Sequence, residues 1–362
     1  MKFFKLITTP TATPSYLPGD TIQNFDTLVW TERYGSAGEF QLSVEKQISL
    51  ISTLPTGTLV SHTDTKEVMI VENHEVEKPK KGNLKVTISG RSLETFVENR
   101  PTAGSLLSIS PNTNIETSAV AASATIAAQL LKGSLEPGTA SVWNAIPNLR
   151  IVTAMRVLDT PMAQVIQRGD VYSRVLDLLK LANGGIKMVR PSGAQTTLDL
   201  VVHDGVDRTQ TIVFNTLRED LEDCKYFWSI KGFKNFAQIA TDITNRLYKS
   251  RDVPGLDTDI KGLDRRIVYV DANDLKLSYS PATSTDVVAA RGQLELDADI
   301  KLYLMEAKIT ETAKPKFKLN YDVGDLVTVV GEFQASQTMR INEYVLTVDK
   351  AGMRGFPSLS AL

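Results

Sequence analysis

The sequence predicts an α+β fold in which antiparallel β-sheet predominates. Runs of alternating apolar and polar residues dominate both ends of the chain, whereas helical periodicity is confined to the middle and to one later segment. One strand-and-turn pattern also occurs twice, as Thr56–Val60 leading to Met69–Glu72 and as Val323–Val327 leading to Met339–Glu343. These observations predict two similar β-barrels with inserted α+β domains.

Each copy of the repeated pattern turns at a glycine. Gly57 and Gly324 can adopt positive φ, and each precedes a Leu-Val pair that begins the first strand of a hairpin. Chance similarity between two ordinary hairpins and an internal duplication both explain the pattern. A duplication predicts that the strands after the two glycines superpose.

The first hundred residues are expected to be β-structure. Asp26–Val44 has the alternation of a hairpin that turns around Gly35–Gly38. The basic run Lys78–Lys81 could bind an anionic partner, but a lysine-rich turn between strands more simply protects a sheet edge. Further strands are expected at Leu59–Val60, Val68–Val71 and Leu84–Ile88.

After Pro101 the composition shifts toward Ala, Ser and Thr, which indicates that another domain begins. We expect one helix at Ser118–Leu131, ending at Gly133, and a second at Val171–Ala182. The Asn183-Gly184-Gly185 sequence follows a helix and does not open one, so it is interpreted as a helix cap and not as a phosphate-binding loop. Strands are expected next at Ile186–Val189 and Leu198–Val202.

The rest of the chain is expected to return to β-structure around one more helix. That helix is predicted at Asp286–Asp297, after a loop at Arg251–Lys261. The expected strands are Thr211–Phe214, Tyr226–Ile230, Ile267–Val270, Tyr303–Ile309, Leu326–Val330 and Tyr344–Val348. The predicted domains are a first β-barrel at 1–98, an inserted α+β domain at 99–220 and 251–318, and a second β-barrel at 221–250 and 319–362.

The charge balance argues against a highly charged partner. The 362 residues include 40 basic and 42 acidic side chains, so no overall field attracts nucleic acid or an anionic membrane. Aromatic residues near Lys225, Lys231 and Lys234 could stack on single-stranded nucleic acid, although strand alternation explains them more simply. No apolar stretch reaches the roughly 20 residues of a membrane-spanning helix, and Met1–Ile7 is too short for a signal peptide.

Few residues are suited to catalysis or metal binding. Cys224 is the only cysteine, which rules out an intramolecular disulfide and a thiolate zinc cluster and fits folding in a reducing cytoplasm. His62, His74 and His203 lie outside any metal-ligand spacing, and the first two are expected at the surface. No catalytic, cofactor-binding or metal-binding residue is assigned, and no cofactor is expected.

The densest polar cluster is Asp204-Gly205-Val206-Asp207-Arg208. Its carboxylates could hold calcium or act as an acid and base pair. A simpler interpretation is a turn in which the Asp side chains accept hydrogen bonds from nearby amides and Arg208 pairs with one of them. Asp271–Asp274 is similar but lacks the glycine and the terminal glutamate of a calcium loop.

Three further sets of residues carry recognisable motifs. They are Trp30–Tyr34 with Gly38–Leu42; His203–Phe214 followed by Leu221, Tyr226, Ser229 and Phe233–Ala237; and Tyr321–Val327 with Arg340–Glu343. Together they resemble the tail-tip (baseplate) hub proteins of long-tailed bacteriophages with non-contractile tails. That family is similar to the central hub of contractile tails and to the core of type VI secretion spikes.

The resemblance implies a structural protein of the virion tail tip, made in the host cytoplasm, and not an enzyme. It implies a homotrimer with two β-barrel tube domains per chain that closes the tail tube. The expected partners are a ring of distal tail protein, the tape measure protein, and tip, fibre or spike proteins, with transient contact to phage DNA in the lumen. Two similar domains per chain would present six nearly equivalent surfaces and so match a trimer to a six-fold tube.

Opening of the tip for DNA ejection would require parts of the hub to move, and the inserted α+β domain is the expected moving element. Because the sequence ends at Leu362, soon after the second hairpin, any lytic or receptor-binding activity is expected to belong to separate proteins. Two other classes of function are alternatives: a cell-wall or polysaccharide hydrolase using Asp204 and Asp207, and a host-surface carbohydrate-binding module. The binding module would use exposed tryptophans, for which Trp30, Trp143 and Trp228 are the candidates.

Overall fold

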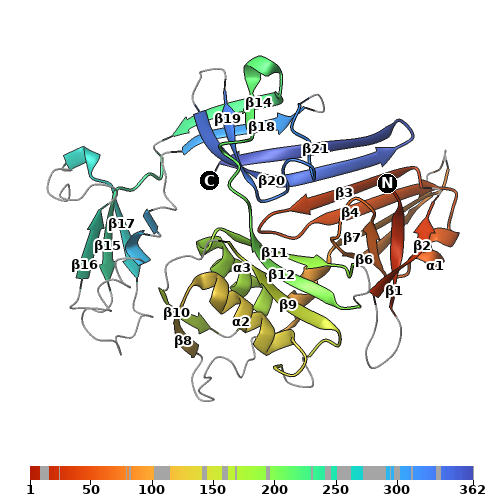
Figure 1. Cartoon of the computed structure of the whole chain (residues 1–362), viewed down its shortest axis with the longest axis horizontal. Coiled ribbons are helices and arrows are strands. Elements are labelled where there is room, and N and C mark those ends of the chain that lie inside the picture. Colours follow the sequence, from red (N-terminus) through yellow and green to blue (C-terminus); the bar gives the residue numbers. More distant parts are fainter. Residues whose placement is uncertain are drawn as a thin grey trace.

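Strands from both ends of the chain form one 13-stranded sheet in the computed structural model (Figure 1). The α+β fold class with a predominance of antiparallel β-sheet is confirmed. The structure describes residues 1–8, 16–23, 25–78, 80, 83–101, 115–140, 145–156, 162–167, 169–192, 196–229, 231–240, 246–250, 262–271, 291–293, 295–296, 302–310, 313–331 and 336–361.

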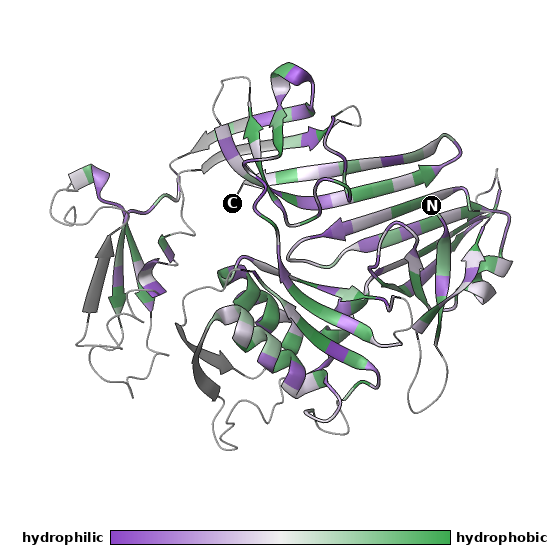
Figure 2. Cartoon of the chain, in the orientation of Figure 1, coloured by the Kyte–Doolittle hydropathy of each residue, from purple (hydrophilic) through white to green (hydrophobic). Residues whose placement is uncertain are grey.

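The N-terminal strands form what we call the first half-sheet. Its strand order is β3 (Thr27–Arg33), β4 (Glu39–Glu45), β7 (Lys85–Ser92), β6 (Met69–Glu77), β5 (Leu59–His62), β1 (Phe3–Thr8) and β2 (Tyr16–Ile22). Hydrophobic and hydrophilic residues alternate along these strands (Figure 2), so that one face buries Trp30, Phe40 and Leu42 while Gln41 stays exposed. The short helix α1 (Ser49–Thr53) contributes Leu50 to this core.

The C-terminal strands form the second half-sheet. Its order is β14 (Leu221–Ser229), β18 (Leu302–Ile309), β21 (Gly352–Ala361), β20 (Ser336–Asp349), β19 (Leu326–Val330) and β13 (Val213–Asn215). A separate core forms on it around Phe214, Val327 and Ile341. The 3-10 helix η2 (Thr216–Arg218) connects β13 to β14.

The two half-sheets share one strand order. The order β3-β4-β7-β6-β5 in the first corresponds to β14-β18-β21-β20-β19 in the second, and each of these pairings is antiparallel. The next position differs, because β1 pairs antiparallel with β5 whereas β13 pairs parallel with β19.

The repeated glycine turns have matching hydrogen bonds. Gly57 and Gly324 have φ values of 86° and 96°, as predicted. The Gly57 amide donates to the carbonyl of Val71 over 2.8 Å, and the Gly324 amide donates to the carbonyl of Ile341 over 2.7 Å. The amides of Val71 and Ile341 donate in return to the residue that follows each glycine. The two turns therefore close their hairpins in the same register.

A β-bulge also recurs at the same place. The register between β6 and β7 shifts between Val71 and Asn73, and the register between β20 and β21 shifts between Ile341 and Glu343. A bulge requires one extra residue at one position of a strand. Shared order, register and bulge favour an internal duplication over chance similarity.

The two similar β-barrels that were predicted do not form closed barrels among the described strands. β20 has 14 residues, and while its first part pairs with β19, Glu343–Val348 pairs with β3. The long strand thus joins the half-sheets edge to edge in one sheet, whose strand order over the described residues does not close on itself. A strand shared across the junction removes an edge that each half would otherwise expose.

The chain between the half-sheets forms an α+β inserted unit. Helices α2 (Ser123–Leu135) and α3 (Val171–Leu181) pack on a three-stranded sheet of β9 (Leu149–Ala154), β12 (Leu198–Asp204) and β11 (Gly184–Val189). β8 (Ile115–Ala121) and β10 (Met162–Gln167) form a two-stranded sheet beside them (Figure 1). The core of this unit continues into the first half-sheet and into the 3-10 helix η1 (Leu93–Asn99), through Phe4, Leu6, Leu59, Val68 and Val97.

A third, small unit lies at one end of the molecule in Figure 1. It contains β15 (Phe236–Ala240), β16 (Arg246–Ser250) and β17 (Ile267–Asp271), with a core of its own, and the 3-10 helix η4 (Gly262–Asp264) precedes β17. Its strands come from both 221–250 and 251–318, as do β14 and β18 of the large sheet. The predicted domain boundaries stay a prediction.

The helices depart from prediction at their ends. α2 begins at Ser123 and not at Ser118, because β8 occupies the preceding residues, and it continues through Gly133. α3 is confirmed, but its C-cap is Ala182, followed by Asn183 with a positive φ of 51°, whereas Gly184 and Gly185 begin β11. Of the helix predicted at Asp286–Asp297, residues 291–293 and 295–296 are helical and the others lie outside the described residues, as do the predicted loop at 251–261 and Trp143.

Candidate functional site

The carboxylates predicted as a polar cluster serve separate structural roles. Asp204 ends β12 and accepts a hydrogen bond of 2.8 Å from the backbone amide of Arg156. Asp207 accepts from the amide and the hydroxyl of Thr209, which lowers its pKa and confirms the predicted turn. Arg208 pairs with Asp325 and not with either of them, because the chain crosses the second half-sheet at this point.

Asp325, directly after the repeated glycine of the second half-sheet, accepts the hydrogen bonds that hold the crossing segment in place. Its side chain is only 4% exposed. It accepts hydrogen bonds from the amides of Val206 (2.7 Å) and Asp322 (3.0 Å) and from Nε of Arg208 (2.6 Å). A buried carboxylate with three donors is well compensated for its loss of hydration.

The backbones of two segments approach closely beside Asp325. A Cβ added to Gly205 would lie 1.7 Å from the carbonyl oxygen of Gly324, and one added to Gly324 would lie 2.5 Å from the ring of Tyr34. Tyr34 follows β3, and its hydroxyl donates 2.6 Å to the carbonyl of Asn183 in the inserted unit. Arg340 lies over the same ring, 4.6 Å from its centroid. Glycine is therefore required at both positions.

Ion pairs join the same parts of the chain. Arg33 of β3 pairs with Glu343 of β20 (2.6 Å) and with Glu39 of β4 (2.5 Å). Lys318 pairs with the buried Glu32 of β3 over 2.8 Å and with Asp322 over 2.7 Å. These contacts lie where β3 of the first half-sheet meets β20 of the second.

The three motif-bearing segments thus converge in space. Trp30–Tyr34 contributes Tyr34 and Arg33, Tyr321–Val327 contributes Gly324 and Asp325, and His203–Phe214 contributes Gly205 and Arg208. We call this meeting point of the two half-sheets and the inserted unit the three-way junction. Its side chains form hydrogen bonds and ion pairs with one another, so they fix the three parts of the chain in place.

Buried ionisable groups lie next to the three-way junction. Burial raises the pKa of Glu94 to about 7 and that of Glu67 well above its usual range. Burial lowers the pKa of His62 to about 4 and that of His203 to about 3. Backbone contacts hold this region: the Val68 amide donates to Met188 and the Arg190 amide donates to Lys66.

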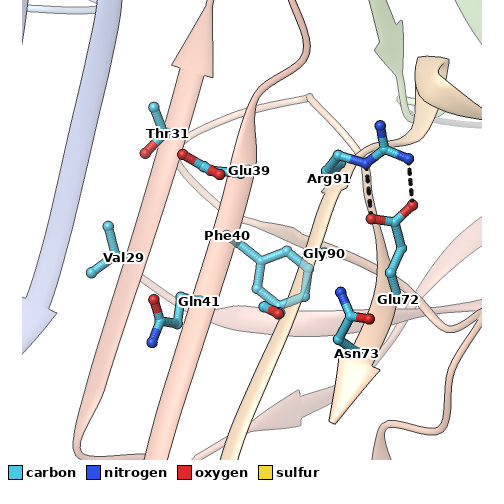
Figure 3. A pocket seen from close by; sticks show the side chains of 10 residues that line it. Val29, Thr31, Glu39, Phe40, Gln41, Glu72, Asn73, Gly90 and Arg91 are labelled. Carbon is cyan, nitrogen blue, oxygen red and sulfur yellow. Dashed lines mark hydrogen bonds and ion pairs between the residues drawn. The ribbon is translucent and has the colours of Figure 1, made fainter. Parts of the chain in front are cut away.

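Two depressions mark the surface near these contacts. One of about 470 Å³ lies between the β5–β6 loop, the end of β11 and the segment before β19, with Glu67, Lys187 and Lys318 among its walls. The other, of about 420 Å³, lies on the polar face of the first half-sheet (Figure 3). There Glu72 and Arg91 face each other in a two-bond ion pair with both distances 3.0 Å. That paired arrangement is typical of a sheet surface.

The other predicted residues are distributed through the fold. The expectation that His62 lies at the surface is wrong: it is 3% exposed and contacts the buried Trp30 edge-on, because β5 is buried along its length. His74 is half-buried, with Nε2 2.7 Å from the carbonyl oxygen of Leu54. Trp228 lies in β14, and its side chain is outside the described part of the structure. Over the described residues no group of three or more His, Cys, Asp or Glu could hold a metal ion.

The comparisons with known proteins bear on the whole chain. The family model described as Siphovirus ReqiPepy6 Gp37-like protein matches residues 16–357. The chain belongs to this family. A search of curated proteins gave no match. Within the described residues, no helix has the length and apolar character needed to cross a membrane.

Three solved structures share the fold of this Gp37-like chain. The 43 kDa tail protein of prophage MuSo2 from Shewanella oneidensis matches with a TM-score of 0.59 and 14% identity, over 99% of this chain and 97% of that one. The tail protein from Neisseria meningitidis MC58 gives 0.58 and 12% over the same shares, 99% and 97%. Prophage tail protein gp18 from Listeria monocytogenes EGD-e gives 0.56 and 10%, over 94% and 90%.

The residues of the three-way junction lie within the motifs found in the sequence, but their contacts with one another were not predicted. Tyr34, Asp325 and Glu32 all lie inside those motifs. A signal was present in the second glycine turn, where an acidic residue precedes the Leu-Val strand in place of Thr58. Its partner Arg208 lies 117 residues away along the chain, so spacing could not reveal the pair.

Proposed function

We propose that this chain is a structural subunit of a siphophage tail and forms a homotrimeric hub at the tail tip. Membership of a siphovirus family and a fold shared with three tail proteins, two of them from prophages, along nearly the whole chain support a tail role. In this role the trimer closes the tail tube, docks on a ring of distal tail protein, contacts the tape measure protein, and anchors tip, fibre or spike proteins.

The observation that carries the proposal is the duplicated half-sheet. The strand order, the glycine-turn register and the bulge repeat within one chain. Three chains with two such half-sheets each present six similar edges and faces. A trimeric ring can then stack on a six-fold tube with each half-sheet, regarded as a tube domain, facing one tube subunit.

The three-way junction supports the same role. It fixes the two half-sheets and the inserted unit to one another through buried hydrogen bonds, ion pairs and close backbone contacts. A hub that transmits force between a tube and tip proteins needs such internal joints. The carboxylates Asp204 and Asp207, in contrast, are each engaged by nearby groups.

The oligomeric state of the purified chain tests the proposal. Light scattering after size-exclusion chromatography is expected to give three times the chain mass of 39.8 kDa, and electron micrographs are expected to show rings with a central channel. A stable monomer, both in solution and in purified tails, would overturn it.

A further inference from the structure

The two half-sheets differ in what covers their outer edges. In β20, Glu343–Val348 is paired with β3 of the other half-sheet. Val71 of β6 is equivalent to Ile341 of β20, and the bulge follows each of them directly. Asn73–Glu77 of β6 is therefore equivalent to Glu343–Thr347 of β20. On the side away from β7, Asn73–Glu77 pairs with no strand among the described residues.

One edge strand of the second half-sheet is β14. Its place in the second half-sheet is that of β3 in the first, and it is the last strand in the order of the described sheet. One cross-strand pair in each half-sheet gives the equivalence. Thr31 lies opposite Glu39 in the first half-sheet and Lys225 lies opposite Glu306 in the second, so Lys225 of β14 is equivalent to Thr31 of β3. β14 thus has the position of β3 but has no partner equivalent to β20 within the described chain.

Equivalent residues differ in exposure between the paired and the unpaired positions. Leu346 of β20 is 3% exposed because it lies opposite Trp30 of β3. Its equivalent in β6, Val76, is 48% exposed. On β14, Phe227 is 52% exposed, at the position that Arg33 occupies in β3. Each unpaired edge thus exposes an apolar side chain that a further strand of the sheet would bury.

We infer that β14 of one chain pairs antiparallel with Asn73–Glu77 of β6 in the next chain, repeating between chains the β3–β20 contact seen within each chain. This inference rests on the proposed trimer and names the surfaces that form it. The contact is head-to-tail. Successive chains close into a ring if each is rotated relative to the last by the angle that relates the two half-sheets of one chain, taken twice. The register that the internal contact gives sets Glu75 opposite Lys225, as Val345 is opposite Thr31, and joins opposite charges across strands.

Cysteine cross-linking tests this register in the full-length chain. In a Cys224→Ser background, Glu75→Cys with Lys225→Cys is expected to give disulfide-linked dimers and trimers on oxidation, because directly opposed residues lie within disulfide range. The pair Thr31→Cys with Val345→Cys occupies the equivalent positions inside one chain and is expected to give only an internally cross-linked monomer. Glu75→Cys with Lys308→Cys places the second thiol one strand further and two residues along that strand, more than about 10 Å away, and is expected not to cross-link.

The outcomes separate this inference from the proposed function. A trimer by light scattering in which the Glu75–Lys225 pair gives no more intermolecular product than the Glu75–Lys308 pair overturns the edge contact and leaves the hub proposal standing. A monomer that forms no intermolecular cross-link overturns both. Dimers and trimers from the Glu75–Lys225 pair alone support the edge contact.

Discussion

Asp325 shows how one residue can hold distant parts of the chain together. Its carboxylate satisfies two backbone amides and one guanidinium in a place where water is excluded. If the carboxylate is removed, these donors stay buried without an acceptor, and that penalty exceeds the net value of the bonds themselves. Asp207, directly after Val206, is exposed, and its carboxylate accepts hydrogen bonds from Thr209 in its local turn.

We therefore expect Asp325→Ala to lower the free energy of unfolding by about 3 kcal/mol. The matched variant Asp207→Ala is expected to change it by less than about 1 kcal/mol. Urea titration followed by circular dichroism measures both. Equal losses for the two variants would show that Asp325 has no special part in the three-way junction.

The buried Glu94 makes stability depend on pH. Its folded pKa of about 7 lies above the unfolded value of 4.5, so the folded protein binds more protons between these values and loses stability as pH rises through 7. Glu94→Gln removes this loss. We expect the variant to match the parent near about pH 4, below the unfolded pKa, and to exceed it by up to about 3 kcal/mol near about pH 8.

Thermal unfolding of parent and variant across this pH range checks the expectation. Glu98→Gln is the control, because Glu98 lies in the same 3-10 helix but is exposed and pairs with Arg91 at the surface. Its difference from the parent is expected to stay constant with pH. A constant difference for Glu94→Gln as well would contradict the role given to burial.

At the scale of elements, the two glycine turns offer a matched comparison. Both glycines have positive φ, but a Cβ on Gly57 would meet no atom within 4 Å, whereas one on Gly324 would clash with the ring of Tyr34. The duplicated turn has thus acquired a second constraint only in the copy that borders the three-way junction.

Gly57→Ala is expected to cost about 1–2 kcal/mol, the strain of a left-handed residue. Gly324→Ala is expected to cost clearly more, because the clash adds to the same strain. A double-mutant cycle with Tyr34→Ser, followed by urea unfolding, is expected to show favourable coupling as the smaller side chain relieves the clash. Equal costs at the two glycines, without coupling, would contradict the close approach.

The inserted unit was the expected moving element, and its packing argues for a fixed attachment. Phe4, Leu6, Leu59 and Val68 of the first half-sheet share one core with α2 and α3. Exposing each such side chain costs about 2 kcal/mol, so separating the two parts would cost several kcal/mol. The small unit has an independent core, which makes it the better candidate for movement relative to the large sheet.

At the scale of the whole molecule, the small unit is an insertion in one hairpin. Ser229 and Leu302 are cross-strand partners, so the chain leaves and re-enters the large sheet at adjacent positions of β14 and β18. In the first half-sheet the equivalent strands β3 and β4 are joined by a short turn. The pairing of Ser229 with Leu302 therefore leaves only a short gap for a turn to close.

Replacing residues 230–301 with an Asn-Gly turn is therefore expected to leave a folded chain with the oligomeric state of the parent. Circular dichroism and light scattering measure the two properties. The matched control replaces residues 115–167, which removes α2 from the shared core, and is expected to unfold the chain. Loss of folding in the first variant would show that the small unit is part of the main body.

The alternation of apolar and polar residues was enough to predict many of the strands, helix α3 and the repeated glycine turns, because these depend on local periodicity and on the φ that glycine permits. It did not reveal β1, β2, β9 or β10, and it gave a helix over the last part of β8. The junction between half-sheets depends instead on contacts between distant residues. That Glu343–Val348 pairs with β3, that Arg208 finds Asp325, and that His62 is buried are set by packing across the sheet. Local sequence carries no record of such pairings, and the three-way junction and the unpaired edges became visible only in the folded chain.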